Sequence, residues 1–131
     1  MIILDTCVLI FDSLTPERLS KKAKETLNAE ENHTNLCCSD ISLWEIAMLI
    51  NKGRLQPGTD CLTYLQLVLA ARQITVLPIT PRIAYLSTSM PEINQHDPAD
   101  RIIAATAKEH RAALVTADQK LLNLREINTI W

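Results

Sequence analysis

Five acidic side chains, spread over four segments of the chain, are the residues whose type and spacing can support chemistry. They are Asp5, Glu45, Asp97, Asp100 and Asp118. Carboxylates within about 4–6 Å of one another raise each other's pKa, so a cluster of them stays ionised only with a positive charge among them. A divalent cation supplies that charge, and oxygen ligands without a set of His or Cys ligands favour Mg²⁺ or Mn²⁺. Bound ions of this kind most often act on phosphate groups.

The segments that carry these acids predict an α/β fold. Short apolar segments alternate with longer segments of helical periodicity, which is the pattern of a parallel sheet covered by helices on both faces. The expected strands are 2–5, 36–39, 74–77, 113–116 and 127–130. The expected helices are 15–29, 41–51, 60–71, 81–88 and 97–110, with a loop over 90–96. Ligands of parallel sheets bind beyond the carboxyl ends of the strands, and all five acids are expected at that edge.

Each acid also has a structural alternative. Asp97 precedes a proline, which fits a helix N-cap, and this role is favoured for Asp97. Asp100 comes three residues later in the same helix, where Asp97 already occupies the cap position, so a functional role is favoured for Asp100. Glu45 is flanked by apolar residues, where an ionised carboxylate is costly unless it is paired or bound to a metal. For Asp5 a pocket position is favoured over a turn, whereas for Asp118 a helix cap and a functional role are equally open.

The composition limits the classes of protein to which the chain can belong. Of its 131 residues, 47% are hydrophobic and 21% charged, with a formal net charge of −2, which fits one soluble domain. No apolar stretch approaches the roughly 20 residues that span a bilayer, and the amino terminus lacks the basic region of a secretory signal. We therefore expect a cytoplasmic protein with four reduced cysteines. Two glycines, Gly53 and Gly58, are too few for a glycine-rich phosphate loop.

Other polar and aromatic residues are expected outside the site. The basic face of helix 15–29 is expected to be solvated, with contact to RNA or a partner as the alternative, and carries Arg18, Lys21, Lys22 and Lys24. The histidines expected on the surface are His33, His96 and His110. The tryptophans expected as core or interface anchors are Trp44 and Trp131. Ser39 or Asp40 is expected to cap helix 41–51, and a cap is the simplest role for Asp40.

Four motifs stand in order along the chain. They are Ile3-Leu4-Asp5-Thr6-Cys7, Ser42-Leu43-Trp44-Glu45-Ile46, Asp97-Pro98-Ala99-Asp100-Arg101 and Leu114-Val115-Thr116-Ala117-Asp118. In this order and spacing the chain resembles the PIN-domain family, and specifically the short VapC-like toxins of bacterial type II toxin–antitoxin pairs. The resemblance implies a single PIN domain over 1–131, built as a three-layer α/β/α sandwich with a central, mainly parallel sheet of four to five strands. It also implies an Mg²⁺- or Mn²⁺-dependent endoribonuclease, a cognate antitoxin that also binds operator DNA, and a homodimer.

The resemblance assigns roles to particular residues. Carried over by motif, the metal-binding and catalytic acids are Asp5, Glu45, Asp100 and Asp118. Thr6 and Thr116 match hydroxyl-bearing positions that orient a carboxylate or a water. Asp97 matches the leading acid of the Asp-Pro-x-Asp-Arg signature, and Arg101 is expected to pair with a nearby acid and fix its rotamer. The implied mechanism is hydrolysis of RNA without a covalent intermediate.

Other interpretations stay open at this point. A PIN scaffold that binds RNA or a protein without cutting is the main alternative, and the presence of all four acids disfavours it. A signal-receiver domain is close to excluded, because 77–80 offers no phosphate-accepting Asp and 128–131 offers no Lys. A set of apolar residues on the early helices forms either a groove for an antitoxin helix or part of the core: Leu9, Ile10, Phe11, Leu14 and Leu49.

Overall fold

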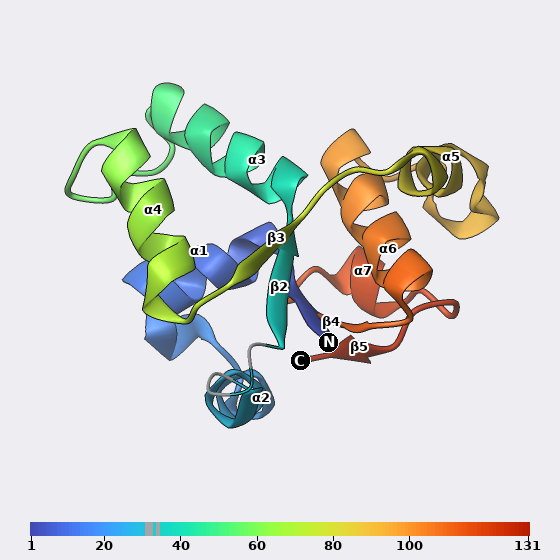
Figure 1. Ribbon diagram of the computed structural model, residues 1–131, viewed down its shortest axis with the longest axis horizontal. Helices are drawn as coiled ribbons and strands as arrows, with labels where there is room; N and C mark the ends of the chain where they lie inside the picture. Colours follow the sequence, from blue (N-terminus) through green and yellow to red (C-terminus); the bar gives the residue numbers. More distant parts are fainter. Residues whose placement is uncertain (31–32, 34) are drawn as a thin grey trace.

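The computed structural model describes residues 1–30, 33 and 35–131, and its centre is a five-stranded parallel sheet (Figure 1). The strands are β1 (Ile2–Leu4), β2 (Leu36–Ser39), β3 (Thr75–Leu77), β4 (Ala113–Val115) and β5 (Thr129–Ile130). Their order across the sheet is β3-β2-β1-β4-β5, and every neighbouring pair is parallel. The carboxyl ends of all the strands therefore lie at one edge, with β1 between β2 and β4.

Helices cover both faces of this sheet. The α-helices are α1 (Thr6–Leu14), α2 (Lys21–Glu30), α3 (Asp40–Asn51), α4 (Cys61–Ala71), α5 (Pro81–Ser89), α6 (Pro98–His110) and α7 (Gln119–Leu122). Short 3₁₀ helices cover η1 (Pro16–Arg18) and η3 (Pro91–Ile93). In Figure 1, α5, α6 and α7 lie to one side of the strands and α1, α2 and α4 to the other, while α3 contacts α1, α4 and α6.

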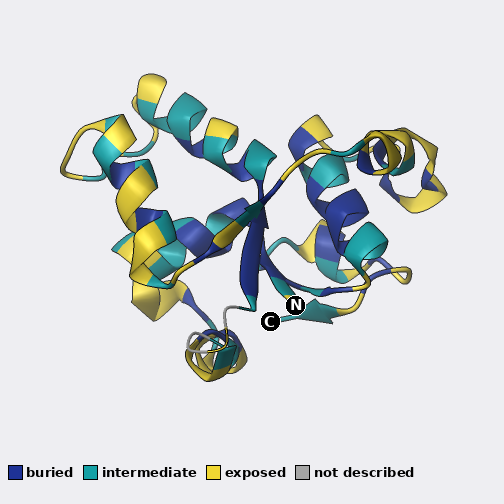
Figure 2. Ribbon diagram, in the orientation of Figure 1, coloured by how far each residue is buried: buried dark blue, intermediate teal, exposed yellow. Residues whose placement is uncertain are grey.

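The core has one layer on each face of the sheet. Ile3 belongs to a buried cluster that includes residues of α5 and α6, whereas the next residue, Leu4, belongs to a cluster that includes residues of α1 and α4. Cys37 and Cys38 divide between the two clusters in the same way, as the alternation of side chains along a strand requires. Figure 2 shows the central strands buried between the helices. The predicted α/β/α sandwich is confirmed.

The segment between β1 and β2 differs from the prediction. Thr6–Leu14 forms α1 directly after β1, where the sequence pattern predicts no helix. The expected helix 15–29 is wrong as a single element, because the chain is extended at Leu19 between η1 and α2. The hydroxyl of Ser20 then accepts a hydrogen bond from the backbone N–H of Ala23 (3.0 Å), as an N-cap of α2 does.

Three single-residue expectations also change. Ser39 caps α3 by accepting a hydrogen bond from the N–H of Ile41 (3.2 Å), and Asp40 instead accepts one from the N–H of Ile79 (3.2 Å). Trp44 is 57% exposed, which excludes the core position and leaves its predicted role as an interface anchor. His96 is half-buried rather than fully on the surface, and neither ring nitrogen has a hydrogen-bond partner among the described residues.

All four cysteines are free thiols, as expected. Among the described helices, none combines the length and the apolar character of a membrane-spanning segment.

Candidate active site

All five acids line one cavity at the carboxyl edge of the sheet. Asp5 follows β1, Asp118 follows the neighbouring strand β4, and Glu45 lies in α3, the helix after β2. Asp97 and Asp100 lie at the start of α6, which packs against α3. The cavity, called the acid cavity below, has a volume of about 480 Å³. Its remaining lining residues are Thr6, Cys7, Ile10, Phe11, Arg18, Leu49 and Ala117.

Asp5 is fixed at the bottom of this site by three donors. It is the N-cap of α1, and its Oδ1 accepts a hydrogen bond from the N–H of Thr6 (2.8 Å). Its Oδ2 accepts hydrogen bonds from Thr116 Oγ1 (2.6 Å) and Cys7 Sγ (3.4 Å). The side chain is only 4% exposed. Burial raises the pKa of Asp5, the three hydrogen bonds oppose that rise, and the charge of Asp118 adds to it.

Glu45 is oriented by the hydroxyl of Thr6. Thr6 Oγ1 donates to Glu45 Oε1 (2.5 Å), and the hydroxyls of Thr6 and Ser42 are hydrogen-bonded to each other (2.9 Å). Burial raises the pKa of Glu45, the Thr6 hydrogen bond lowers it, and the negative charges of Asp5 and Asp97 raise it further. The Thr6 hydroxyl therefore stabilises an ionised carboxylate that its surroundings disfavour.

Asp118 and Asp97 both stand at helix N-cap positions, yet only Asp118 caps its helix. Asp118 Oδ1 accepts a hydrogen bond from the N–H of Lys120 (2.8 Å), and its own N–H donates to Thr116 Oγ1 (3.0 Å). The cap uses Oδ1 of Asp118, and the residue still lines the acid cavity. Asp97 makes no capping hydrogen bond with its side chain. The favoured structural role of Asp97 is therefore not supported by its side-chain contacts.

Asp100 responds to the charges of all four other acids. The pKa of this half-buried side chain is raised to about 7, first by burial and then by the negative charges of Asp5, Asp118, Glu45 and Asp97. Four acids that each act on one side chain lie close enough to repel one another, so the acid cavity is a region of concentrated negative charge. A bound cation relieves this repulsion.

Arg101 bonds to backbone carbonyls, whereas the sequence predicted a bond to an acid. Its guanidinium donates to the backbone carbonyls of His96 (Nε, 2.8 Å) and Asn94 (NH2, 2.5 Å). No ion pair joins Arg101 to an acid among the described residues. The expected pairing is wrong, because the segment before α6 turns two carbonyl groups toward Arg101, which accept from its Nε and Nη2. Arg101 thus holds the loop that leads into Asp97.

The donor set of the acid cavity fits a hard cation. Its ligating groups are carboxylate and hydroxyl oxygens, which Mg²⁺ and Mn²⁺ prefer. No group of three or more His, Cys, Asp or Glu side chains in the described part of the chain is placed to hold one metal ion directly. Mg²⁺ usually keeps several of its waters and is bound through only one or two carboxylates, so a hydrated ion needs fewer direct protein ligands than such a group supplies.

Sequence reasoning missed two polar contributors to the site. Ser42 joins the Thr6 and Glu45 pair from inside α3, and Cys7 donates to Asp5. Both residues stand inside the quoted motifs, but their contacts depend on α1 beginning at Thr6, which the sequence pattern does not show. Arg18 also lines the acid cavity, although it was expected on a solvated helix face.

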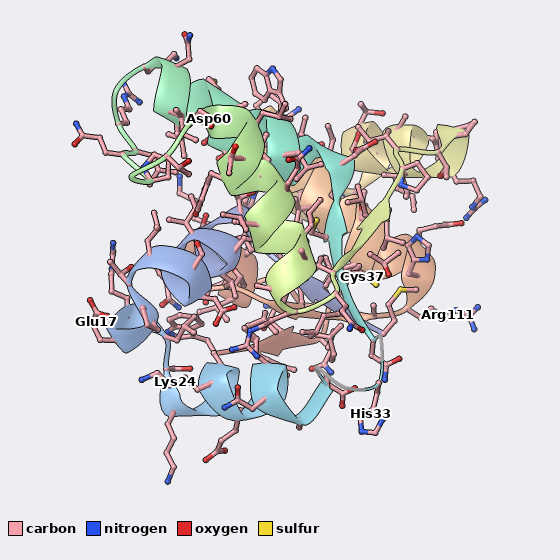
Figure 3. The ribbon with its side chains drawn as sticks, turned by 60° about the vertical axis from the view of Figure 1, so that its left-hand side comes forward. Glu17, Lys24, His33, Cys37, Asp60 and Arg111 are labelled. Carbon is pink, nitrogen blue, oxygen red and sulfur yellow. The ribbon has the colours of Figure 1, made fainter. Side chains whose placement is uncertain are left out.

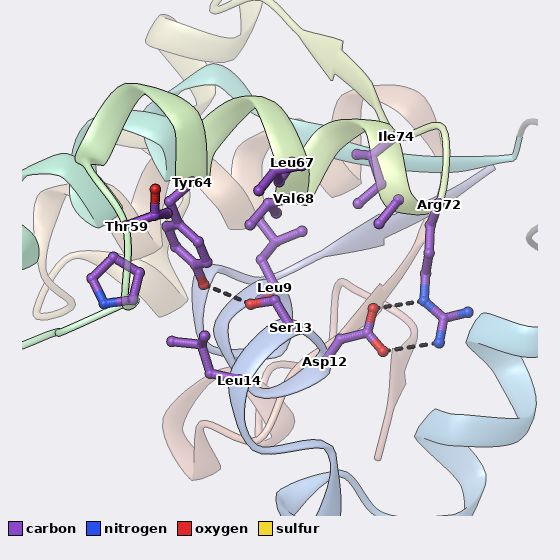
Figure 4. A pocket seen from close by; sticks show the side chains of 12 residues that line it. Leu9, Asp12, Ser13, Leu14, Thr59, Tyr64, Leu67, Val68, Arg72 and Ile74 are labelled. Carbon is purple, nitrogen blue, oxygen red and sulfur yellow. Dashed lines mark hydrogen bonds and ion pairs between the residues drawn. The ribbon is translucent and has the colours of Figure 1, made fainter.

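A second hollow of about 520 Å³ lies between α1 and α4 (Figure 4). Its polar side chains satisfy one another, since Arg72 donates from two nitrogens to the carboxylate of Asp12 (2.6 and 2.9 Å) and Ser13 is hydrogen-bonded to Tyr64 (2.6 Å). Leu9 and Leu14 both line it, and Leu9 is almost fully buried. These two pairs join α1 to α4 and its C-cap Arg72 across the hollow.

Comparison with known proteins shows the family of this chain. A family model described as the PIN domain matches residues 2–127. The chain is also 35% identical to ribonuclease VapC22 of Mycobacterium tuberculosis over 132 residues, which cover 99% of this chain and 98% of that protein. The chain belongs to the PIN-domain family.

Solved structures share the fold at lower sequence identity. VapBC2 from Rickettsia felis, bound to a DNA fragment from its promoter, matches with a TM-score of 0.76 and 17% identity over 98% of this chain and 97% of that chain. DNA-bound VapBC from Salmonella typhimurium matches with a TM-score of 0.71 and 20% identity over 98% and 95%. FitAcB from Neisseria gonorrhoeae matches with a TM-score of 0.67 and 23% identity over 98% and 96%.

Proposed function

We propose that this protein is a metal-dependent endoribonuclease and the toxin component of a type II toxin–antitoxin pair. The observation that carries this function is the meeting of five carboxylates from four separate segments around one cavity. Identity of 35% to a protein named as a ribonuclease, over almost the full length of both chains, supports the same activity.

Asp5, Asp100 and Asp118 are the residues that would hold Mg²⁺ or Mn²⁺, with Glu45 completing the set. When bound, such an ion polarises the phosphodiester, lowers the pKa of a water and stabilises the negative charge that develops on the phosphate. Asp97 lies at the exposed rim of the acid cavity, where it adds negative charge to the site.

Hydrogen bonds from neighbouring groups hold the carboxylates of Asp5 and Glu45 in fixed orientations. Thr116 and the start of α1 fix the two oxygens of Asp5. Thr6 fixes Oε1 of Glu45, which leaves the other oxygen of that carboxylate to orient the attacking water and accept its proton. No protein nucleophile is needed. The Cys7 thiol has a pKa raised to about 12, mainly by burial and then by the charge of Asp5, so it stays protonated at neutral pH.

The biological setting follows from the same proposal. The whole chain, 1–131, acts as one PIN domain in the cytoplasm, where its thiols stay reduced. Its partners are RNA, a cognate antitoxin protein and a second copy of the chain. The antitoxin assignment is supported by the fold shared with the VapBC and FitAcB structures.

Cleavage of RNA by purified variants tests the activity. Wild type is expected to cut total cellular RNA with Mg²⁺, whereas Asp100→Asn and Glu45→Gln are expected to lose about 100-fold or more in rate. Asp60→Asn is the matched control, because Asp60 is an exposed cap of α4 and Asn caps helices equally well. Equal cleavage by Asp100→Asn and Asp60→Asn would contradict the function. Mapping the cut ends after brief expression identifies the RNA.

A further inference from the structure

Arg18 places a positive charge in the wall of the acid cavity. Among the described residues that line this cavity, Arg18 is the single Lys or Arg beside five carboxylates. One doubly charged ion leaves such a wall negative, so an RNA backbone that approaches it is repelled. A fixed cation at the rim offsets this repulsion at the place where a phosphate must pass.

The guanidinium of Arg18 is held in place without using its hydrogen-bond donors. Its central carbon lies 4.1 Å from the centre of the Phe11 ring, which is cation–π geometry. Phe11 in turn packs against Trp131, with ring centres 6.4 Å apart. Among the described residues, Arg18 makes no hydrogen bond or ion pair through its side chain. Stacking occupies one face of the guanidinium and leaves its N–H edges available.

We propose that Arg18 binds a backbone phosphate of the RNA substrate next to the bond that is cut. A guanidinium matches the two oxygens of a phosphodiester and stays charged at every physiological pH. Phosphate contacts of this kind set the register of a nucleic acid rather than read its sequence. Because RNA is the substrate only under the proposed function, the Arg18 site rests on that function.

The lysines of α2 do not offer the same contact. Lys21, Lys22 and Lys24 are exposed, but none of them lines the acid cavity. The carboxyl-terminal end of α2 leads toward the amino-terminal end of β2, at the opposite edge of the sheet from the acids (Figure 1). Arg111 lies at that opposite edge too, just before β4, and extends away from the molecule (Figure 3). It is the matched control for Arg18, since both are exposed arginines and each substitution removes one charge.

Salt-dependent RNA binding tests the Arg18 site. Binding of a fluorescent single-stranded RNA of mixed sequence is measured in an Asp5→Asn background, which prevents cleavage. Adding Arg18→Gln is expected to weaken binding about tenfold and to reduce the slope of log affinity against log salt by about 0.7, the value for one lost phosphate contact on a single strand. Arg18→Lys keeps the charge and is expected to restore most of the slope. Adding Arg111→Gln is expected to change binding less than about twofold.

The outcomes separate this site from the proposed function. Equal losses from Arg18→Gln and Arg111→Gln, or an unchanged salt slope with a lowered unfolding midpoint, would overturn the Arg18 site and reduce Arg18 to a structural role on Phe11. In the cleavage assay with Asp5 restored, Arg18→Gln is expected to raise KM more than it lowers kcat. RNA binding through Arg18 by a wild-type protein that never cuts would overturn the nuclease function alone.

Discussion

At the scale of single residues, the site depends on two hydroxyl groups as much as on its acids. Thr116 Oγ1 donates to Asp5 and accepts from the N–H of Asp118, so one side chain links two acids that follow adjacent strands. Thr6 performs the corresponding task for Glu45. Both threonines are buried, where their hydrogen bonds are shielded from water and hold each carboxylate in one orientation.

Replacing the Thr116 hydroxyl by a methyl group tests this role. Thr116→Val is expected to lower the rate of RNA cleavage by about 10- to 100-fold, because Asp5 loses a partner that fixes its Oδ2. Thr116→Ser keeps the hydroxyl and is expected to retain most of the rate. Steady-state kinetics over a range of Mg²⁺ concentrations measures both variants. A Val variant as active as wild type would show that the hydroxyl does not prepare the site.

The raised pKa of Asp100 predicts how the free energy of unfolding depends on pH in the absence of divalent metal. Its pKa is raised to about 7 in the folded protein, from an ordinary value of 3.8, so the folded state binds more protons than the unfolded state between these values. The free energy of unfolding therefore falls as pH rises through this range. Asp5 and Glu45 act with the same sign, because the pKa of each is also raised.

Urea unfolding in EDTA at about pH 5 and about pH 8 measures this effect. Asp100→Asn is expected to be more stable than wild type at the higher pH by about 1 kcal/mol, a figure kept small because the side chain is partly solvated. At the lower pH the difference is expected to shrink. A variant that is less stable than wild type at the higher pH would contradict the mutual repulsion of the acids.

At the scale of secondary structure, helix α1 ties the site to the fold. Asp5 ends β1 and caps α1, so the residue that enters the acid cavity also starts the first helix. The five strands were predicted to within two residues at each end, because each is a short apolar run between polar segments. Helix α1 was not predicted, since Val8 to Phe11 is apolar all along and shows no amphipathic alternation.

The two roles of Asp5 can be separated by substitution. Asp5→Asn keeps an N-cap acceptor and removes a buried charge, so its free energy of unfolding is expected to equal or exceed that of wild type without metal. Asp5→Ala loses the cap and is expected to be about 1 kcal/mol less stable than Asp5→Asn. Both variants are expected to lack activity. Equal stability of the two variants in urea would show that Asp5 contributes nothing as a cap.

The sequence predicted the position of the acids in the site but not the contacts that depend on the shape of a loop. Convergence of the five acids was expected from a parallel sheet, because the carboxyl ends of its strands and the starts of the helices that follow them meet at one edge. The hydrogen-bond partners of Arg101 were not predicted, because the carbonyls of His96 and Asn94 become available only through the shape of the loop before α6. The contact of Arg18 with the acid cavity was missed for a similar reason, since it requires η1 to separate from α2.

At the scale of the whole molecule, the topology concentrates charge that the composition does not reveal. The chain carries a net charge of only −2, yet five of its carboxylates line one cavity at one edge of the sheet. Two core layers, on opposite faces of the strands, pack the helices against the sheet that carries this edge. The fold therefore concentrates negative charge in one place, and under the proposed function a cation neutralises it so that a phosphate can approach.

Calorimetric titration of Mn²⁺ into the purified protein tests this central claim most directly. Wild type is expected to bind the ion at a defined stoichiometry, and a folded variant in which Asp5, Glu45, Asp100 and Asp118 are replaced by their amides is expected to show no heat beyond dilution. The amide variant keeps the size of every side chain, so lost binding reports lost charge. Identical titration curves for the two proteins, or no binding by wild type, would contradict a metal-dependent nuclease and favour a PIN scaffold that does not cut.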